Sequence, residues 1–228
     1  MALRIESRPV GDVLVVQCYG RIVNGPEVHA LHAYFGDTRA KYVEVVMQLD
    51  QVEFLDSSGL GALVRLMHTS RAKQGDLKLC GVPENIRRTL QMTNLLSLFE
   101  VYDSLEEAIT AAYLGSRYSK GKEGDTRLRV LCLVDSGDVR ALLREVLLSS
   151  GYNPLVTAKV EDAKILLKAM KAQTLVVSAK LQAADSKTAI EALRQTDPGI
   201  RAIVLEEDFA AQDPGEAAQK LLARLSKA

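Results

Sequence analysis

The stretch Phe54-Leu-Asp-Ser-Ser-Gly-Leu-Gly61 decides the fold that we expect for this chain. Within it, Asp56–Gly59 follows an apolar, strand-like approach that includes Val52, Phe54 and Leu55. The same segment precedes a stripe of apolar residues at helical spacing, Leu60, Leu63, Val64 and Met67. Asp and Ser are preferred at helix N-caps because their side-chain oxygens accept hydrogen bonds from the orphan N–H groups of the first turn. We therefore expect a strand, a tight turn over Asp56–Gly59 and a helix that starts near Leu60.

The same turn is suited to a charge switch. A helix N-terminus attracts negative charge through its free N–H groups and its dipole. A phosphoryl group on Ser57 would add a charge of about −2 to the surface without disturbing the fold. Gly59 and Gly61 are expected to leave the surroundings open to another molecule. On spacing alone the turn can equally be only a cap, so both interpretations stay open at this point.

The composition excludes several classes of function. Lys+Arg and Asp+Glu both number 29, and without a local basic patch this balance argues against nucleic-acid binding. Cys18, Cys80 and Cys132 lie in apolar, strand-like runs, so we expect reduced thiols that fill core space. No apolar run reaches the ~18 residues of a membrane span, and the N-terminus lacks a signal-peptide layout. A cytoplasmic protein without membrane segments is expected.

A glycine-rich and charged segment divides the chain. Residues 115–127 hold too few large apolar side chains to bury a surface, which indicates a linker between domains at 1–114 and 128–228. Both flanking parts alternate strands and helices, which predicts an α/β fold for each. In the first part we expect strands over 12–19, 43–49 and 77–80. In the second part the short strand–helix succession from Arg129 onward predicts a parallel sheet built from βαβ units.

The motif at residues 54–61 resembles the signature loop of STAS domains, the anti-sigma-factor antagonist family. The resemblance covers about residues 3–114 and implies a STAS-like mixed sheet packed with helices. It extends to Gly20-Arg-Ile-Val23, to Val45-Val-Met-Gln-Leu-Asp50 and to Leu77-Lys-Leu-Cys-Gly-Val82. Further along the chain, Ile86-Arg-Arg-Thr-Leu-Gln-Met-Thr-Asn-Leu95 and Leu98-Phe-Glu-Val-Tyr-Asp-Ser104 follow in the family's order.

The resemblance implies a phosphorylation switch. In such proteins an anti-sigma factor with serine kinase activity phosphorylates the serine after the motif's Asp, and a phosphatase resets it. Carried over by position, Ser57 is the acceptor and Asp56 positions it or faces the kinase. The other partner-binding residues would be Ser58, Gly59, Leu60 and Gly61 in the motif and Val23, Asn24 and Gly25 in the neighbouring turn. Val23 stands where many antagonists carry an acidic residue that helps to contact the kinase.

The second part resembles a response-regulator receiver domain over about residues 128–227, which implies a flavodoxin-like parallel α/β fold. Receiver chemistry needs a pair of acids after the first strand and an acceptor carboxylate after the third. Here Asp135 fills one acidic position, Asp138 lies farther along, and Ser178 stands at the acceptor position. The segment 207–215, which should supply a last strand and its lysine, is short. The resemblance therefore implies a degenerate receiver that does not accept phosphate and offers a protein-binding surface or holds a homodimer.

No catalytic or metal site can be assembled from the sequence. His29 and His32 lack further ligands at useful spacing, so neither a metal nor a cofactor is expected. Ser57 has no identifiable base, and no nucleotide-binding glycine loop occurs. We expect a regulatory binding module and no enzyme. The alternative is a scaffold that is never phosphorylated and uses the same face for constitutive assembly.

Overall fold

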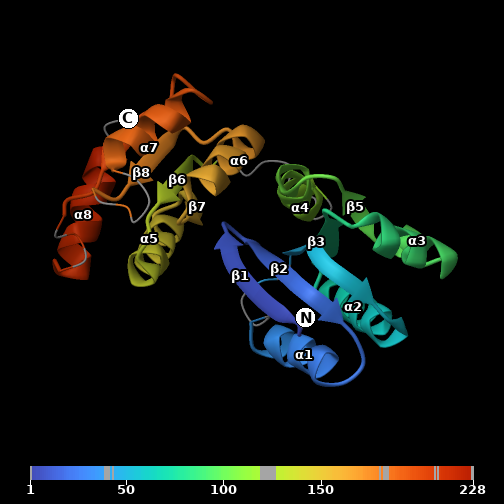
Figure 1. Cartoon of the computed structure of the whole chain (residues 1–228). Coiled ribbons are helices and arrows are strands. Elements are labelled where there is room, and N and C mark those ends of the chain that lie inside the picture. Colours follow the sequence, from blue (N-terminus) through green and yellow to red (C-terminus); the bar gives the residue numbers. More distant parts are fainter. Residues whose placement is uncertain are drawn as a thin grey trace. The chain divides into compact units, whose positions relative to one another are not determined.

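The computed structural model describes residues 2–38, 42, 44–118, 127–179, 181, 185–207, 209 and 211–226 of the chain. The chain divides into two compact units, residues 1–123 and 124–228 (Figure 1). Each unit contains its own sheet.

The N-terminal unit is built on a mixed five-stranded sheet in the order β1-β2-β3-β4-β5. Its first two strands form an antiparallel hairpin, and every later neighbour is parallel. The strands are β1 (Arg4–Val10), β2 (Val13–Ile22), β3 (Glu44–Leu55), β4 (Leu77–Cys80) and β5 (Glu100–Tyr102). The sequence pattern did not predict β1 or β5, because β1 is an edge strand with little burial and β5 has only three residues.

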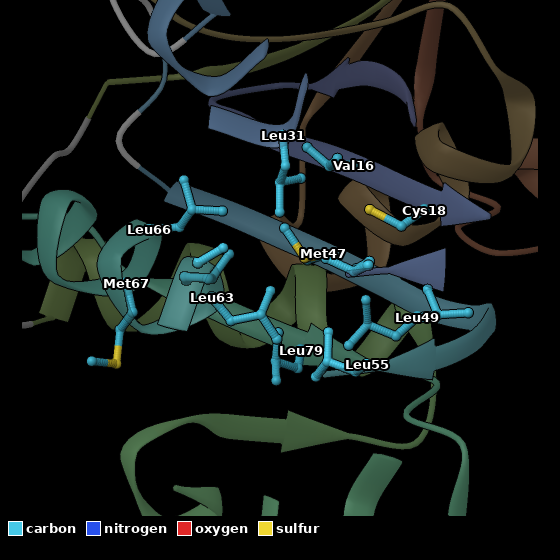
Figure 2. Close-up of a cluster of buried hydrophobic side chains, with 14 of the residues drawn as sticks. Val16, Cys18, Leu31, Met47, Leu49, Leu55, Leu63, Leu66, Met67 and Leu79 are labelled. Atoms are coloured by element: carbon cyan, nitrogen blue, oxygen red, sulfur yellow. The ribbon is translucent and has the colours of Figure 1, made fainter. Parts of the chain in front are cut away.

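Helices cover both faces of this sheet (Figure 1). The strand alternation directs Leu14, Val16 and Cys18 to one face, where they join a core with three helices (Figure 2). Val13 and Val15 are buried on the opposite face, which the fourth helix covers. The helices of the first face are α1 (Pro26–Thr38), α2 (Ser57–Ala72) and α3 (Glu84–Met92), with a short 3-10 turn at Leu96–Leu98, and the fourth is α4 (Leu105–Tyr118).

The end of α4 corrects one expectation from the sequence. The predicted linker begins at Gly115, yet the helix continues through Tyr118. Ala112 and Tyr113 are buried and hold this helix against the sheet. Because a formed helix is extended more easily than it is started, the next turn is also helical although its composition is typical of a linker. Residues 119–126 of the predicted linker lie outside the described residues. The helical spacing of Val28, Leu31 and Phe35 predicts a helix from Pro26 to about Lys41; α1 covers Pro26–Thr38, and residues 39–41 lie outside the described residues.

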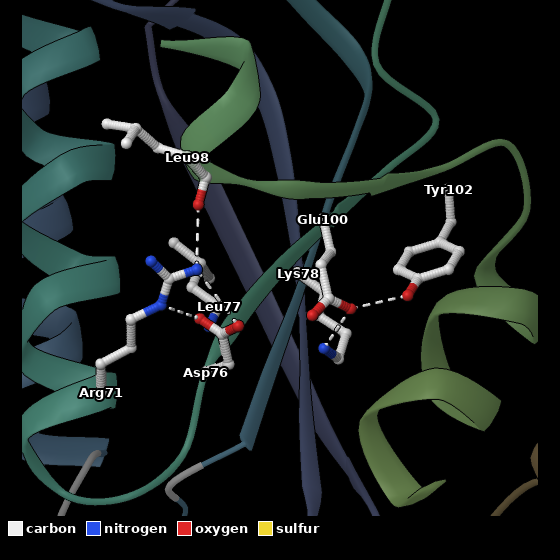
Figure 3. A network of polar contacts seen from close by, with 7 residues as sticks. All are labelled: Arg71, Asp76, Leu77, Lys78, Leu98, Glu100 and Tyr102. Carbon is white, nitrogen blue, oxygen red and sulfur yellow. Dashed lines mark hydrogen bonds and ion pairs between the residues drawn. The ribbon is translucent and has the colours of Figure 1, made fainter. Parts of the chain in front are cut away.

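Polar side chains attach the short strands β4 and β5 to their neighbours (Figure 3). Arg71, at the end of α2, donates from Nε to Asp76 at 2.9 Å and from Nη2 to the carbonyl oxygen of Leu98 at 2.9 Å. On β4, the nearly fully buried Lys78 pairs with Oε2 of Glu100 on β5 at 2.6 Å. A buried ammonium group without a partner costs free energy, so this ion pair favours the pairing of β5 with β4. The contribution matters because β5 is short and forms few backbone hydrogen bonds.

The C-terminal unit is a parallel four-stranded sheet in the order β7-β6-β8-β9. Its strands are β6 (Arg129–Leu133), β7 (Asn153–Thr157), β8 (Thr174–Val177) and β9 (Arg201–Val204). One face packs on α5 (Gly137–Ser149) and α8 (Pro214–Leu225), and the other on α6 (Val160–Met170) and α7 (Ser186–Arg194). This is the parallel sheet expected from the strand–helix alternation, while its assignment to the receiver-like family stays a prediction.

A tyrosine on α4 fixes the β1–β2 hairpin. The Tyr113 hydroxyl donates to the carbonyl oxygen of Val10 at 2.9 Å and accepts from the backbone N–H of Asp12 at 2.7 Å. Gly11 lies between them with φ +57°, and a Cβ at this position would lie 1.5 Å from the tyrosine oxygen. The hairpin therefore requires glycine here both for its backbone conformation and for the space that the hydroxyl fills.

The substitution Gly11→Ala should destabilise the N-terminal unit by about 2–4 kcal/mol, because it strains the turn and displaces a hydroxyl with two buried hydrogen bonds. Native-state hydrogen exchange of the β2 amides measures this loss. Gly36→Ala is the matched control, since Gly36 is a helical glycine with nothing within 4 Å of an added Cβ. The control should stabilise the unit by at most about 1 kcal/mol. Equal exchange rates in the two variants would contradict the packing described here.

Candidate functional site

The motif at residues 54–61 lies where two parallel strands end at the same edge of the sheet. The pairing of β2 with β3 continues to Ile22 opposite Leu55, and the Asp56 N–H then donates to the carbonyl oxygen of Ile22 at 3.3 Å. The turn Val23–Gly25 after β2 and the first turn of α2 after β3 are therefore neighbours in space. Sequence reasoning brought these two segments together, and the structure does so as well.

Asp56 connects the two segments through both of its carboxylate oxygens. Oδ1 accepts the N–H of Gly59 in α2 at 2.8 Å, and Oδ2 accepts the N–H of Asn24 at 2.8 Å. The hydrogen bonds from Asn24 and then from Gly59 lower the pKa of Asp56 below its ordinary value, against a smaller opposing effect of burial. Asp56 is thus an ionised N-cap that fixes the turn after β2 to the start of α2.

Ser57 is the first residue of α2 and its side chain is exposed. The helix was expected to start near Leu60, but the Asp56 cap brings its start forward to Ser57. The hydroxyl of Ser57 therefore stands at the positive end of a 16-residue helix, accessible to another molecule. Ser58, the next residue, is half-buried.

Two motif residues expected to bind a partner are instead packed inside. Leu60 is 5% exposed and belongs to the hydrophobic core. Gly59 is also buried, and a Cβ there would lie 2.3 Å from the carbonyl oxygen of Ile22. The expectation that Gly59 leaves open space is wrong: its missing side chain allows α2 to approach β2. At Gly61, by contrast, the nearest atom to an added Cβ is Nη1 of Arg65, at 3.7 Å.

A pocket of about 470 Å³ adjoins Ser57. Its lining residues come from the β2–α1 turn, α1 and α2, and they are Asn24, Val28, His29, His32, Ser57, Ser58, Gly61 and Arg65. Sequence reasoning considered the two histidines only as a metal site and missed Arg65. The signal for Arg65 was its spacing, since it follows Ser57 by eight residues and Gly61 by four on one helix.

Arg65 is hydrogen-bonded to His32 across the pocket. Its Nε and Nη2 lie 3.3 and 3.1 Å from Nε2 of the imidazole. A guanidinium can only donate, so Nε2 is the acceptor of a neutral ring whose proton is on Nδ1. Burial lowers the pKa of His32, and the charges of Arg65 and His29 lower it further. The pocket therefore carries the positive charge of Arg65 beside neutral His32.

An exposed aromatic ring flanks the same edge of the sheet. Phe54 is 47% exposed at the end of β3, and the guanidinium carbon of Arg21 lies 5.4 Å from its ring centroid. Exposed aromatic and arginine side chains are common anchors of protein interfaces. Sequence reasoning treated Phe54 as part of the apolar approach and did not include it among the partner-binding residues.

The C-terminal unit also has a pocket at the carboxyl ends of its strands. Asp135 and Ser178 line it together with Glu206, and its volume is about 210 Å³. Asp138 is not among its lining residues and instead lies exposed in the first turn of α5. Arg140 donates from Nη1 to the carbonyl oxygens of Val134 and Asp135, each at 2.7 Å. The structure thus joins two of the three predicted receiver-site residues and separates the third.

Within the described parts of the chain, every helix is too short or too polar to cross a membrane.

The N-terminal unit is similar to known proteins. Residues 8–108 match the family described as STAS domain, the domain predicted for this part of the chain. An anti-sigma F factor antagonist from Paenibacillus polymyxa is 27% identical over 111 residues, covering 48% of this chain and 95% of that protein. These matches concern the N-terminal unit, and the receiver-like character of the second unit stays a prediction.

Solved structures give similar matches. The crystal structure of an anti-sigma factor antagonist from Mycobacterium paratuberculosis is 24% identical, with 49% of this chain and 95% of that chain covered and a TM-score of 0.40. The Bacillus cell fate determinant SpoIIAA in its phosphorylated form is 21% identical, with 47% and 96% covered and a TM-score of 0.39.

The substitution Asp56→Ala should destabilise the N-terminal unit by about 1–2 kcal/mol and should speed hydrogen exchange at the Asn24 amide, because it removes both acceptors. In the unaltered chain, protection of this amide should fall with acid. The folded pKa of Asp56 lies below its ordinary value, so its stabilisation is present above about pH 4 and is lost as the pH falls through the folded pKa.

The matched control is Asp185→Ala, which removes the N-cap of α7 in the other unit. This control should leave the Asn24 amide unchanged. If Asn24 exchanges at the same rate in Asp56→Ala as in the control, the carboxylate does not hold the turn.

Proposed function

We propose that the N-terminal unit docks a kinase-type anti-sigma factor or a related signalling partner, and that phosphorylation of Ser57 switches this docking. The observation that carries the proposal is the exposed Ser57 hydroxyl at the start of α2, on a STAS domain and beside the turn that Asp56 fixes. The similarity to an anti-sigma F factor antagonist supports the same class of partner.

The switch acts through charge at a rigid surface. A phosphoryl group on Ser57 adds a charge of about −2 where free N–H groups and the helix dipole tolerate it. The core residues of α2 lie on another side of the helix, so the fold is retained while the partner meets a changed surface. A partner that binds the chain with unmodified Ser57 is released when Ser57 is phosphorylated. A phosphatase removes the phosphate and restores the form that binds.

The docking face comprises the turn Val23–Gly25, the exposed residues Ser57 and Phe54, and Ser58 and Gly61. Phe54 gives this face an apolar anchor, and Arg21 beside it gives a positive charge. Gly59 and Leu60 contribute indirectly, because they seat the start of α2 against the sheet. Val23, in place of an acidic residue, reduces the negative charge of the face and bears on which kinase it accepts.

For the C-terminal unit we propose a degenerate receiver-like domain that binds protein or holds a homodimer. Its strand order, second-first-third-fourth, agrees with the first four strands of the flavodoxin-like order. At the pocket formed by Asp135, Ser178 and Glu206, a serine hydroxyl in place of a carboxylate is a weak metal ligand and a poor phosphoryl acceptor. A regulatory role without catalysis or a cofactor fits both units.

Phosphorylation at Ser57 can be tested with the full chain, ATP and a lysate of its native cell, followed by phosphopeptide mass spectrometry. We expect phosphate on the peptide that contains Ser57, and its loss in Ser57→Ala by at least about tenfold, since the acceptor oxygen is removed. Ser97→Ala is the control and should retain the label, because Ser97 is an exposed serine of the 3-10 turn at Leu96–Leu98 and lies outside the docking face. Label that persists in Ser57→Ala would exclude Ser57 as the acceptor.

The alternative function is a constitutive scaffold that assembles through the same face. The exposed Phe54 would serve a permanent interface equally well. Intact-mass measurement of the protein isolated from its native cell separates the two functions. A phosphorylated fraction that varies with growth conditions supports the switch, and a single unmodified mass under all conditions supports the scaffold.

A further inference from the structure

The pocket beside Ser57 has basic side chains on both of its helical walls. His29 and His32 come from α1, and Arg65 comes from α2. The proposed docking of a partner does not require them, because the docking face does not include these three residues and its apolar anchor, Phe54, does not line this pocket. A pocket that holds two histidines and an arginine next to a serine hydroxyl is suited to an anionic group.

Arg65 is directed toward the start of α2. Residues 57, 61 and 65 are spaced by four, so they follow one face of the helix, and helical side chains lean toward the N-terminus. The position of Nη1, 3.7 Å from where a Cβ of Gly61 would be, shows this lean directly. Gly61 is about 6 Å of helical rise from Ser57, so the guanidinium lies within about one turn of the serine. A larger residue at 61 would obstruct this path.

The hydrogen bonds of Arg65 leave its charge available. His32 accepts from Nε and Nη2 as a neutral ring, and Nη1 is the nitrogen that lies over Gly61. The carboxylate of Asp56 accepts from two backbone N–H groups, and neither Asp56 nor Glu27 lines the pocket. Arg65 and the histidines can therefore offset the repulsion between Asp56 and a phosphoryl group on Ser57.

We propose that the pocket of His29, His32 and Arg65 receives the phosphoryl group of phosphorylated Ser57 within the same chain. This inference rests on the proposed function, in which Ser57 is the acceptor. The phosphate oxygens accept from Nη1 of Arg65, and the neutral ring of His32 can add its Nδ1–H as a further donor. The phosphoserine is then held between α1 and α2, so phosphorylation changes the charge of this groove as well as that of the helix start.

The test uses the full chain with phosphoserine incorporated at position 57 during translation, so it depends on no kinase. Phosphorus-31 NMR gives the second pKa of the phosphoserine, and imidazole NMR gives the pKa and tautomer of His32. The charged groups around the phosphate are Arg65 and the histidines, together with Asp56 and Arg21. In Arg65→Gln the phosphoserine pKa should rise by about one unit, because an adjacent cation is lost.

The matched control is Arg88→Gln, an exposed arginine on α3 that pairs with Glu84 and does not line the pocket. It should leave the phosphoserine pKa unchanged. In the unsubstituted chain, phosphorylation should raise the pKa of His32 and shift its Nε2 resonance. The proposal would be overturned if the phosphoserine pKa were equal in Arg65→Gln and Arg88→Gln and if phosphorylation left the pKa and the Nε2 resonance of His32 unchanged. A native kinase that ignores Ser57 would instead refute the proposed function and leave these NMR results standing.

Discussion

The candidate site depends on one carboxylate with two backbone partners. Asp56 follows β3, caps α2 through Gly59 and holds the turn after β2 through Asn24. Because β2 and β3 are parallel, their carboxyl ends meet at one edge, and a single side chain can fix both of the segments that follow. The position of the Ser57 hydroxyl follows from this arrangement, since Ser57 is the residue next to the cap.

Much of the fold was predictable because strong signals agreed with each other. The continuous apolar runs of β2 and β3 predict strands buried on both faces, the apolar stripe of α2 predicts a helix, and the structure contains both. The edge strands were missed for a physical reason: β1 carries three charged residues and buries only Val10, and β5 is stabilised by the ion pair between Lys78 and Glu100 rather than by its own pattern. Such tertiary contacts have no signature in a local window of sequence.

The residues of the turn around Asp56 and Ser57 were predictable from the sequence, whereas the packing and the pocket beside them were not. Asp56 and Ser57 were identified from cap chemistry and family resemblance, and the turn Val23–Gly25 from the resemblance alone. The burial of Gly59 was not foreseen, because a glycine that permits close helix packing and a glycine that leaves open space look the same in a sequence. Arg65 was overlooked because it lies eight residues after Ser57, and the spacing alone does not show that its guanidinium extends over Gly61.

The central claim is that phosphorylation at Ser57 alters a preformed surface and leaves the fold intact. The most direct measurement compares the amide NMR spectra of the full chain with serine and with phosphoserine at position 57. We predict shifts confined to Val23–Gly25, the start of α2 and the pocket residues of α1, with the buried amides of β3 and β4 unchanged. Shifts spread across the sheet, or loss of the Asn24 hydrogen bond, would contradict this claim.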